Sequence, residues 1–126
     1  MAKVTGINHV TLAVSDLTRS IAFYADLLGF LVRNRTEISA YLEAGSFWLA
    51  LVHDRNCRQG PLPEYSHVAF TIDASELAPL ANKLISAGAI SWQKSDRANS
   101  FYFLDPDGHK LELHSGTLEN RLKFSQ

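Results

Sequence analysis

Hydrophobic residues alternate with polar or small residues in two similar segments, one near the start of the chain and one near its middle. Residues 8–14 read N-H-V-T-L-A-V and residues 66–72 read S-H-V-A-F-T-I. A period of two is typical of a strand with one buried face, so each segment predicts such a strand. His9 and Thr11, and likewise His67, lie on the side opposite the large apolar residues. The likeness of the two segments indicates an internal repeat.

A helical pattern follows each predicted strand. After the first strand, Ser15 or Asp16 is a candidate cap for a helix with apolar residues at helical spacing, and Gly29 ends it. After the second strand, Ser75 is the candidate cap of the next helix. Pro79 falls near the first turn of that helix, where proline is tolerated.

Three short strand-like runs follow each helix, and they complete a unit of the form βαβββ that occurs twice. The runs cover about residues 30–35, 39–44, 47–53, 89–94, 100–104 and 109–114. Half-buried sheets with one helix per unit predict an α+β fold, with helices on one face and a concave cavity on the other. We expect one domain over residues 1–126, with module one at about 5–55, module two at about 64–116 and a short C-terminal helix at 117–126.

Composition and charge narrow the class of protein. Hydrophobic residues make up 46% and charged residues 20%, values of an ordinary globular domain. Twelve Lys and Arg against 13 Asp and Glu leave a net charge of −1, which predicts neither a nucleic-acid nor a membrane partner. The single cysteine, Cys57, cannot form an internal disulfide, which suits a reducing compartment. We therefore expect a cytoplasmic protein.

The last predicted strand, residues 109–114, adds a carboxylate to the two histidines. Its leucines share the apolar face, so Glu112 points to the same side as His9 and His67 do on their strands. Two imidazoles and one carboxylate form a ligand set for a divalent metal that leaves positions open for a substrate. A single histidine on a strand is more often a hydrogen-bonded polar residue than a ligand, but the set of three favours a metal site. His114 faces the same way and is a candidate to support the ligands.

The repeated modules and this triad resemble the vicinal-oxygen-chelate superfamily, which includes glyoxalases, extradiol dioxygenases and drug-resistance proteins. Within it, the sequence resembles most the fosfomycin-resistance thiol transferases, especially their glutathione-using branch. The most specific match is S-F-Y-F-L-D-P-D-G-H-K-L-E-L-H-S-G-T-L at residues 100–118, followed by Arg121. The resemblance covers nearly the whole chain.

The resemblance implies a vicinal-oxygen-chelate fold in a homodimer that exchanges modules, so that His9 of one subunit completes a manganese site with His67 and Glu112 of the other. It implies fosfomycin, a small phosphonate that carries an epoxide, as one substrate and a thiol, most of all glutathione, as the second. The resemblance implies catalytic roles for Thr11, beside the oxirane oxygen, and for Tyr41, which would orient the thiol. It implies that Trp48 and Tyr65 line the pocket. It also implies that the phosphonate is bound by Ser100, Tyr102 and Arg121. Without the resemblance, the aromatic residues of this set read as core and the arginine as a solvated helix residue.

The loop before the specific block departs from the family pattern. Residues 92–100 read W-Q-K-S-D-R-A-N-S, which is one residue shorter than the potassium-binding loop of the glutathione-using branch and lacks its glycine. Gln93 stands where the family has a phosphonate-binding lysine, and Lys94 or Arg97 is the candidate to replace it. The sequence therefore does not favour a potassium site, and it predicts weaker catalysis than in the best resistance enzymes.

Other functions within and outside this family remain open. The chain fits other metal-dependent enzymes of the superfamily, namely a lyase, a dioxygenase or an epoxide hydrolase. The hydrolase needs a glutamate base where Ser39 stands, and extradiol dioxygenases are usually longer. A metal-free drug-binding resistance protein belongs to a different class, and it does not need the three ligands that this chain retains.

Overall fold

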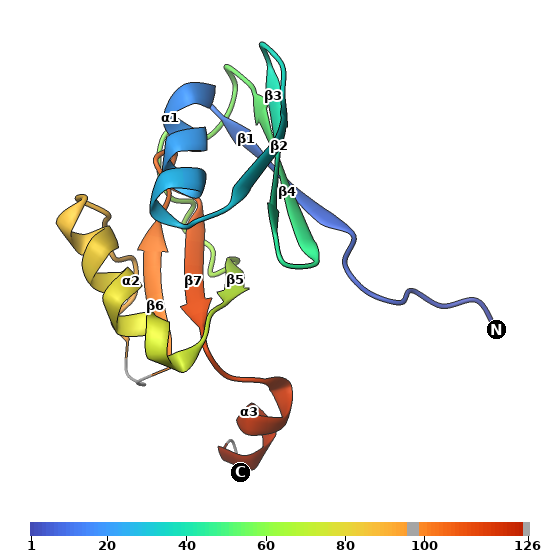
Figure 1. Ribbon diagram of the computed structural model, residues 1–126, viewed down its shortest axis with the longest axis vertical. Coiled ribbons are helices and arrows are strands. Elements are labelled where there is room, and N and C mark those ends of the chain that lie inside the picture. Colours follow the sequence, from blue (N-terminus) through green and yellow to red (C-terminus); the bar gives the residue numbers. More distant parts are fainter. Residues whose placement is uncertain (96–98, 125–126) are drawn as a thin grey trace. The chain divides into compact units, whose positions relative to one another are not determined.

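A computed structural model describes residues 1–95 and 99–124, without the side chain of Phe124. By the contacts between its residues, the chain divides into two compact units, Met1–Arg58 and Gln59–Gln126. Each unit holds one sheet with its own helices (Figure 1). Along the described parts, no helix has both the length and the apolar character needed to cross a membrane.

The first unit forms a sheet of four strands. Its elements are β1 (His9–Val14), α1 (Leu17–Ala22), the π-helical turn η1 (Phe23–Leu27), β2 (Leu31–Arg35), β3 (Ser39–Ala44) and β4 (Phe47–His53). The strand order is β1-β4-β3-β2, with β1 parallel to β4 and the other neighbours antiparallel. The edge strand β2 is exposed along its whole length.

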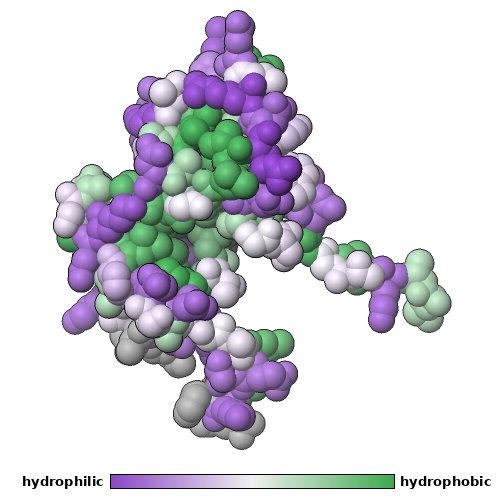
Figure 2. Space-filling view, viewed as in Figure 1, coloured by the Kyte–Doolittle hydropathy of each residue, from purple (hydrophilic) through white to green (hydrophobic). Residues whose placement is uncertain are grey.

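In the space-filling view, apolar side chains gather in patches between hydrophilic ones (Figure 2).

The alternating pattern assigns the two faces of this sheet correctly. Its apolar face is fully buried at Val14, Leu42, Leu49 and Leu51. Helix α1 contacts β3 and β4 and contributes the buried Leu17. The burial of these residues stabilises the unit, because apolar area removed from water is worth about 25 cal/mol per Å². The opposite face is left for the polar and aromatic residues.

The second unit forms a sheet of three strands. Its elements are β5 (Val68–Thr71), α2 (Ala74–Ser86), β6 (Ser100–Leu104), β7 (Lys110–His114) and α3 (Leu118–Phe124). The order is β5-β7-β6, with β5 parallel and β6 antiparallel to β7. Leu111 and Leu113 of β7 are buried on the apolar face, as are Phe103 of β6 and Leu84 of α2. The α+β class of the fold is thus confirmed, while the exchange of modules between subunits stays a prediction.

The helix boundaries confirm one predicted cap and correct another. The side chain of Asp16 accepts a hydrogen bond from the backbone N–H of Arg19, as its place before α1 predicts. Ser75 is not the cap of α2, because the helix already starts at Ala74. The residue at the cap position is Asp73, which has an extended conformation and whose backbone carbonyl accepts a hydrogen bond from the N–H of Glu76. Pro79 consequently lies in the second turn.

The predicted strand at about 89–94 is wrong. The backbone there makes one sheet-like hydrogen bond, from the N–H of Leu104 to the carbonyl of Ile90 (2.8 Å). The Ser91 hydroxyl donates to the carbonyl of Tyr102 (2.9 Å), so a side chain takes the acceptor that a paired strand would use. The second sheet therefore ends at β6.

A histidine beside a turn is expected to be solvated, but the turn between β6 and β7 is packed around His109. One oxygen of the Asp105 carboxylate accepts from the backbone N–H groups of Asp107 and His109, and the other lies 2.8 Å from His109 Nδ1. His109 is only 5% exposed. Gly108 has a φ of +92°, and a Cβ there would lie 2.4 Å from the carbonyl carbon of Gly60. Only glycine fits this close approach.

Candidate functional site

Two of the predicted ligands meet in the second unit. His67 immediately precedes β5, and Glu112 lies at the centre of β7, the strand that pairs with β5. His67 Nε2 lies 2.9 Å from Glu112 Oε1, and Glu112 is only 5% exposed. A carboxylate this deeply buried requires a partner with positive charge or a proton.

The tautomer of His67 favours a cation at this point. His67 Nδ1 lies 3.2 Å from the backbone carbonyl of Tyr65, which can only accept a hydrogen bond. Nδ1 therefore carries the proton, and Nε2 of a neutral ring presents its lone pair to the carboxylate of Glu112. Two groups that both donate electron pairs approach this closely only with a second proton or a cation between them.

The distance between these two atoms suits a divalent metal. Ligand bonds of about 2.1 Å at right angles place two donor atoms about 3 Å apart, close to the observed 2.9 Å. Nitrogen and carboxylate oxygen are also ligand types that transition metals accept. Within residues 1–95 and 99–124, no group of three or more His, Cys, Asp and Glu side chains is arranged to hold a metal. The set of three with His9 stays a prediction.

His9 belongs to the first unit, on the polar face of its sheet. Its Nδ1 lies 2.7 Å from Asn8 Oδ1, and its ring stacks on Trp48 at 3.9 Å with an interplanar angle of 14°. An Nδ1–H bonded to the amide oxygen leaves Nε2 as the nitrogen with the lone pair, the same tautomer as in His67. The imidazole of His9 is thus oriented by groups of its own unit, and its metal-binding role stays a prediction.

The predicted residues of β1, β3 and β4 share this face. Thr11 and Tyr41 both pair with Ala50, one from each side, which places them in one row across the sheet. Tyr41 also packs edge-on against Trp48, with ring centroids 5.1 Å apart, and its side chain is 44% exposed. The pairing explains why these residues, far apart in the chain, form one surface.

Aromatic rings surround His67 in the second unit. Their centroids lie within about 6 Å of the imidazole, at 5.3 Å for Tyr65, 5.2 Å for Trp92 and 6.1 Å for Tyr102. The sequence pattern predicts no site role for Trp92, whose indole N–H donates to the carbonyl of Leu111. Its place directly before the loop at 93–99 was the only available signal. The Gln93 side chain donates a hydrogen bond to the Tyr65 hydroxyl at 2.8 Å, so this loop residue contacts one of the aromatic residues around His67.

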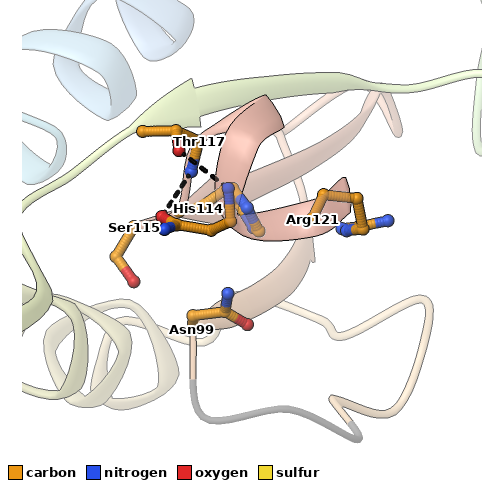
Figure 3. A pocket seen from close by; sticks show the side chains of 7 residues that line it. Asn99, His114, Ser115, Thr117 and Arg121 are labelled. Carbon is orange, nitrogen blue, oxygen red and sulfur yellow. Dashed lines mark hydrogen bonds between the residues drawn. The ribbon is translucent and has the colours of Figure 1, made fainter. Parts of the chain in front are cut away.

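A cavity of about 220 Å³ is lined by Arg121, one of the predicted phosphonate residues (Figure 3). Its walls include His114, Asn99 and Arg121, the last from the exposed helix α3. Ser100 itself is buried, and its hydroxyl donates to Glu112 Oε2 at 2.8 Å. The Oδ1 atom of Asn99 is buried with no hydrogen-bond partner in the described parts of the chain. The sequence pattern predicts no site role for Asn99.

Lys94 and Arg97 are the two candidates to replace the family's phosphonate-binding lysine. Lys94 is exposed and does not line the cavity. Arg97 lies outside the described residues. The assignment of a phosphonate-binding role to Lys94 stays a prediction.

Comparison with known proteins identifies the family. Residues 6–113 match the model of the Glyoxalase/Bleomycin resistance protein/Dioxygenase superfamily. Since this match covers most of the chain and spans both units, the chain belongs to that superfamily of vicinal-oxygen-chelate proteins.

Individual relatives narrow the assignment to the fosfomycin-resistance transferases of the superfamily. The chain is 46% identical over 119 residues to the glutathione transferase FosA of Serratia marcescens, covering 92% of this chain and 84% of the relative. It is 40% identical over 126 residues to the metallothiol transferase FosB of Staphylococcus haemolyticus, covering 96% and 91%. The resemblance read from the sequence is confirmed.

Solved structures give the same fold. The fosfomycin resistance protein FosX of Listeria monocytogenes matches with a TM-score of 0.82 and 27% identity, over 96% of this chain and 98% of that one. A mutant of the same protein was solved with Mn(II) and 1S,2S-dihydroxypropylphosphonic acid, and it matches with a TM-score of 0.80 and 26% identity, over 96% and 99%.

Proposed function

We propose that this protein adds a thiol, preferably glutathione, to fosfomycin and opens its epoxide in a reaction that depends on Mn²⁺. The observation that carries the proposal is the pair of His67 Nε2 and Glu112 Oε1, held 2.9 Å apart. The relatives named as glutathione and metallothiol transferases support the reaction class. A cytoplasmic location, where such thiols are abundant, is part of the proposal.

The reaction requires one bond to form and one to break. The thiolate sulfur forms a bond with an epoxide carbon, the carbon–oxygen bond of the ring breaks, and the oxygen takes up a proton. His9, His67 and Glu112 would hold the metal, which supplies Lewis-acid polarisation of that oxygen when bound. The Thr11 hydroxyl would donate to the oxirane oxygen.

Residues from both units would bind the two substrates. Tyr41, exposed on the first sheet, would orient the thiol and favour the thiolate, which is the reactive form. Arg121 and Tyr102 would bind the phosphonate, since a guanidinium and a hydroxyl are strong donors to its oxygens. Trp48 and Tyr65 would line the pocket. We also propose a homodimer in which His9 serves the partner's site.

The decisive experiment identifies the product. Protein loaded with Mn²⁺ is incubated with fosfomycin and glutathione, cysteine or another small thiol, and the product is identified by mass spectrometry. We expect the mass of a thiol adduct, and no adduct from protein stripped with a chelator. An unchanged epoxide with every thiol, or a product that gained only water, would overturn the proposal.

Hydrolysis of the epoxide is the second candidate, because FosX structures are among the neighbours and one of them holds a dihydroxypropylphosphonic acid. Hydrolysis needs a base that removes a proton from water. Ser39, on the polar face of β3, has a hydroxyl 2.9 Å from the Thr36 hydroxyl. A serine hydroxyl without an adjacent base does not serve as that base, so the thiol reaction is favoured.

Gln93 offers a test of the altered loop. We expect Gln93→Lys to raise kcat/KM for fosfomycin about tenfold, because a charged contact to the phosphonate is worth about 1.5–3 kcal/mol. A lysine ammonium can also keep the hydrogen bond to the Tyr65 hydroxyl. Gln93→Ala is the matched control: it loses that bond without adding charge and should lower kcat/KM. Equal kcat/KM for the lysine variant and the wild type would contradict a phosphonate site at this loop.

A further inference from the structure

The imidazole of His114 connects two residues of the candidate site. His114 Nδ1 lies 2.8 Å from Ser100 Oγ and 3.1 Å from Glu112 Oε2. The register of the sheet creates this contact, because Ser100 pairs directly with His114 and the polar side chains of β6 and β7 face the same way. All three residues belong to the second unit.

The number of protons available determines the direction of each hydrogen bond. An ionised carboxylate only accepts, so His114 Nδ1 carries a proton that it shares between Glu112 and Ser100. The single hydroxyl proton of Ser100 goes to Glu112 Oε2 at 2.8 Å. With that proton engaged, Ser100 has only a lone pair to offer, and it cannot donate to a phosphonate.

Gly116 provides independent support for the placement of this ring. A Cβ at Gly116 would lie 2.8 Å from His114 Nε2 and 3.1 Å from Asn99 Nδ2. Any side chain at this position would push the imidazole out of its place, because real Cβ contacts are not that short. The glycine therefore leaves the space that the ring occupies at the cavity wall (Figure 3).

We propose that His114 is a positioning residue of the metal site, and that Ser100 works with it as a brace on Glu112 rather than as a phosphonate donor. The inference rests on the proposed metal site. Two donors hold Oε2 of Glu112, which prevents the carboxylate from rotating and leaves Oε1 directed at His67 Nε2. A ligand held in this way loses less conformational entropy when the metal binds.

Three substitutions at one position test the brace. His114→Asn keeps an N–H donor near the place of Nδ1, His114→Gln moves the donor to the place of Nε2, and His114→Leu removes it. Binding of Mn(II) to purified protein is measured by the loss of the free-ion signal in electron paramagnetic resonance. We expect 10- to 100-fold weaker binding, on the order typical of lost supporting contacts, for the leucine and glutamine variants. The asparagine variant should bind within a few-fold of the wild type.

Further variants separate positioning from folding and from substrate binding. His53→Leu, at the exposed end of β4, is the control for the loss of a histidine, and thermal melts report the fold of each variant. Ser100→Ala should weaken Mn(II) binding while the KM for fosfomycin at saturating metal stays unchanged. Wild-type affinity in His114→Leu, an asparagine variant as weak as the leucine variant, or a Ser100→Ala effect on KM alone would overturn the proposal.

A metal-free measurement distinguishes this inference from the proposed function. In ¹⁵N-labelled apoprotein, the imidazole nitrogens of His114 should show a proton on Nδ1 that Ser100→Ala shifts. An Nδ1 without a proton would overturn the brace even if the enzyme proved active. Conversely, a wild type that forms no thiol adduct but shows this proton and binds Mn(II) would refute the thiol reaction and leave the brace intact.

Discussion

Two inactive variants, His9→Ala and Glu112→Ala, are expected to regain activity when their chains are mixed. If His9 completes the partner's site, the mixed dimer has one site with all its ligands and one that lacks two. Random pairing of equal amounts makes about half of the dimers mixed, so about a quarter of the wild-type activity should return. The subunits are exchanged by dilution from mild denaturant, and the rate of adduct formation is measured.

The double variant His9→Ala/Glu112→Ala provides the matched control. Mixed with an equal amount of wild type, it should leave only the wild-type homodimers active, about a quarter of all sites. If each chain built its own site, every wild-type chain would keep its activity, which makes about half of the sites active. No recovery in the first mixture together with half activity in the second would contradict the shared site.

Replacing Glu112 by glutamine should lower activity about a thousandfold, because a divalent metal contributes several kcal/mol to the stabilisation of the developing oxyanion. The substitution removes the charge of a carboxylate that is 5% exposed and lies 2.9 Å from His67 Nε2. Mn(II) affinity is measured by electron paramagnetic resonance, and the fold by circular dichroism. Affinity and activity should fall together while the fold stays intact.

The choice of glutamine over alanine matters for this test. Glu112→Ala would leave the donors on Ser100 and His114 without their acceptor, at a cost of about 1–3 kcal/mol in stability, whereas an amide oxygen can still accept. Glu37→Gln, an exposed carboxylate before β3, is the control and should leave activity unchanged. Full activity of Glu112→Gln without bound metal would disprove the metal site.

The absence of a strand at residues 89–94 and the burial of His109 could not be predicted, because both depend on competition for hydrogen bonds. Residues 89–94 have a strand-like composition, yet the Ser91 hydroxyl takes the carbonyl of Tyr102 that a neighbouring strand would need. His109 reads as solvated beside a turn, yet Asp105 accepts from both its backbone and its ring. The burial of both partners stabilises that turn, and neither partner is visible in a periodic pattern.

The sequence by itself determined which side of each strand carries the candidate ligands. Side chains alternate along a strand because of its local backbone geometry, so the period of two was sufficient to set His9, His67 and Glu112 apart from the buried leucines. The family could also be predicted from the sequence, because the block at 100–118 is specific. The similarity to the resistance transferases confirms this family.

Only the tertiary structure decided the distances within the candidate site. The order β5-β7-β6 brings Glu112 to within 2.9 Å of His67 Nε2 and of Ser100 Oγ, and it places His114 against both Ser100 and Glu112. Strand order and register arise from contacts between segments far apart in the chain, and no local pattern encodes them. For the same reason, the contact of the Ser100 hydroxyl with Glu112 Oε2 was not predicted, and the phosphonate-binding role that the resemblance implies for Ser100 stays a prediction.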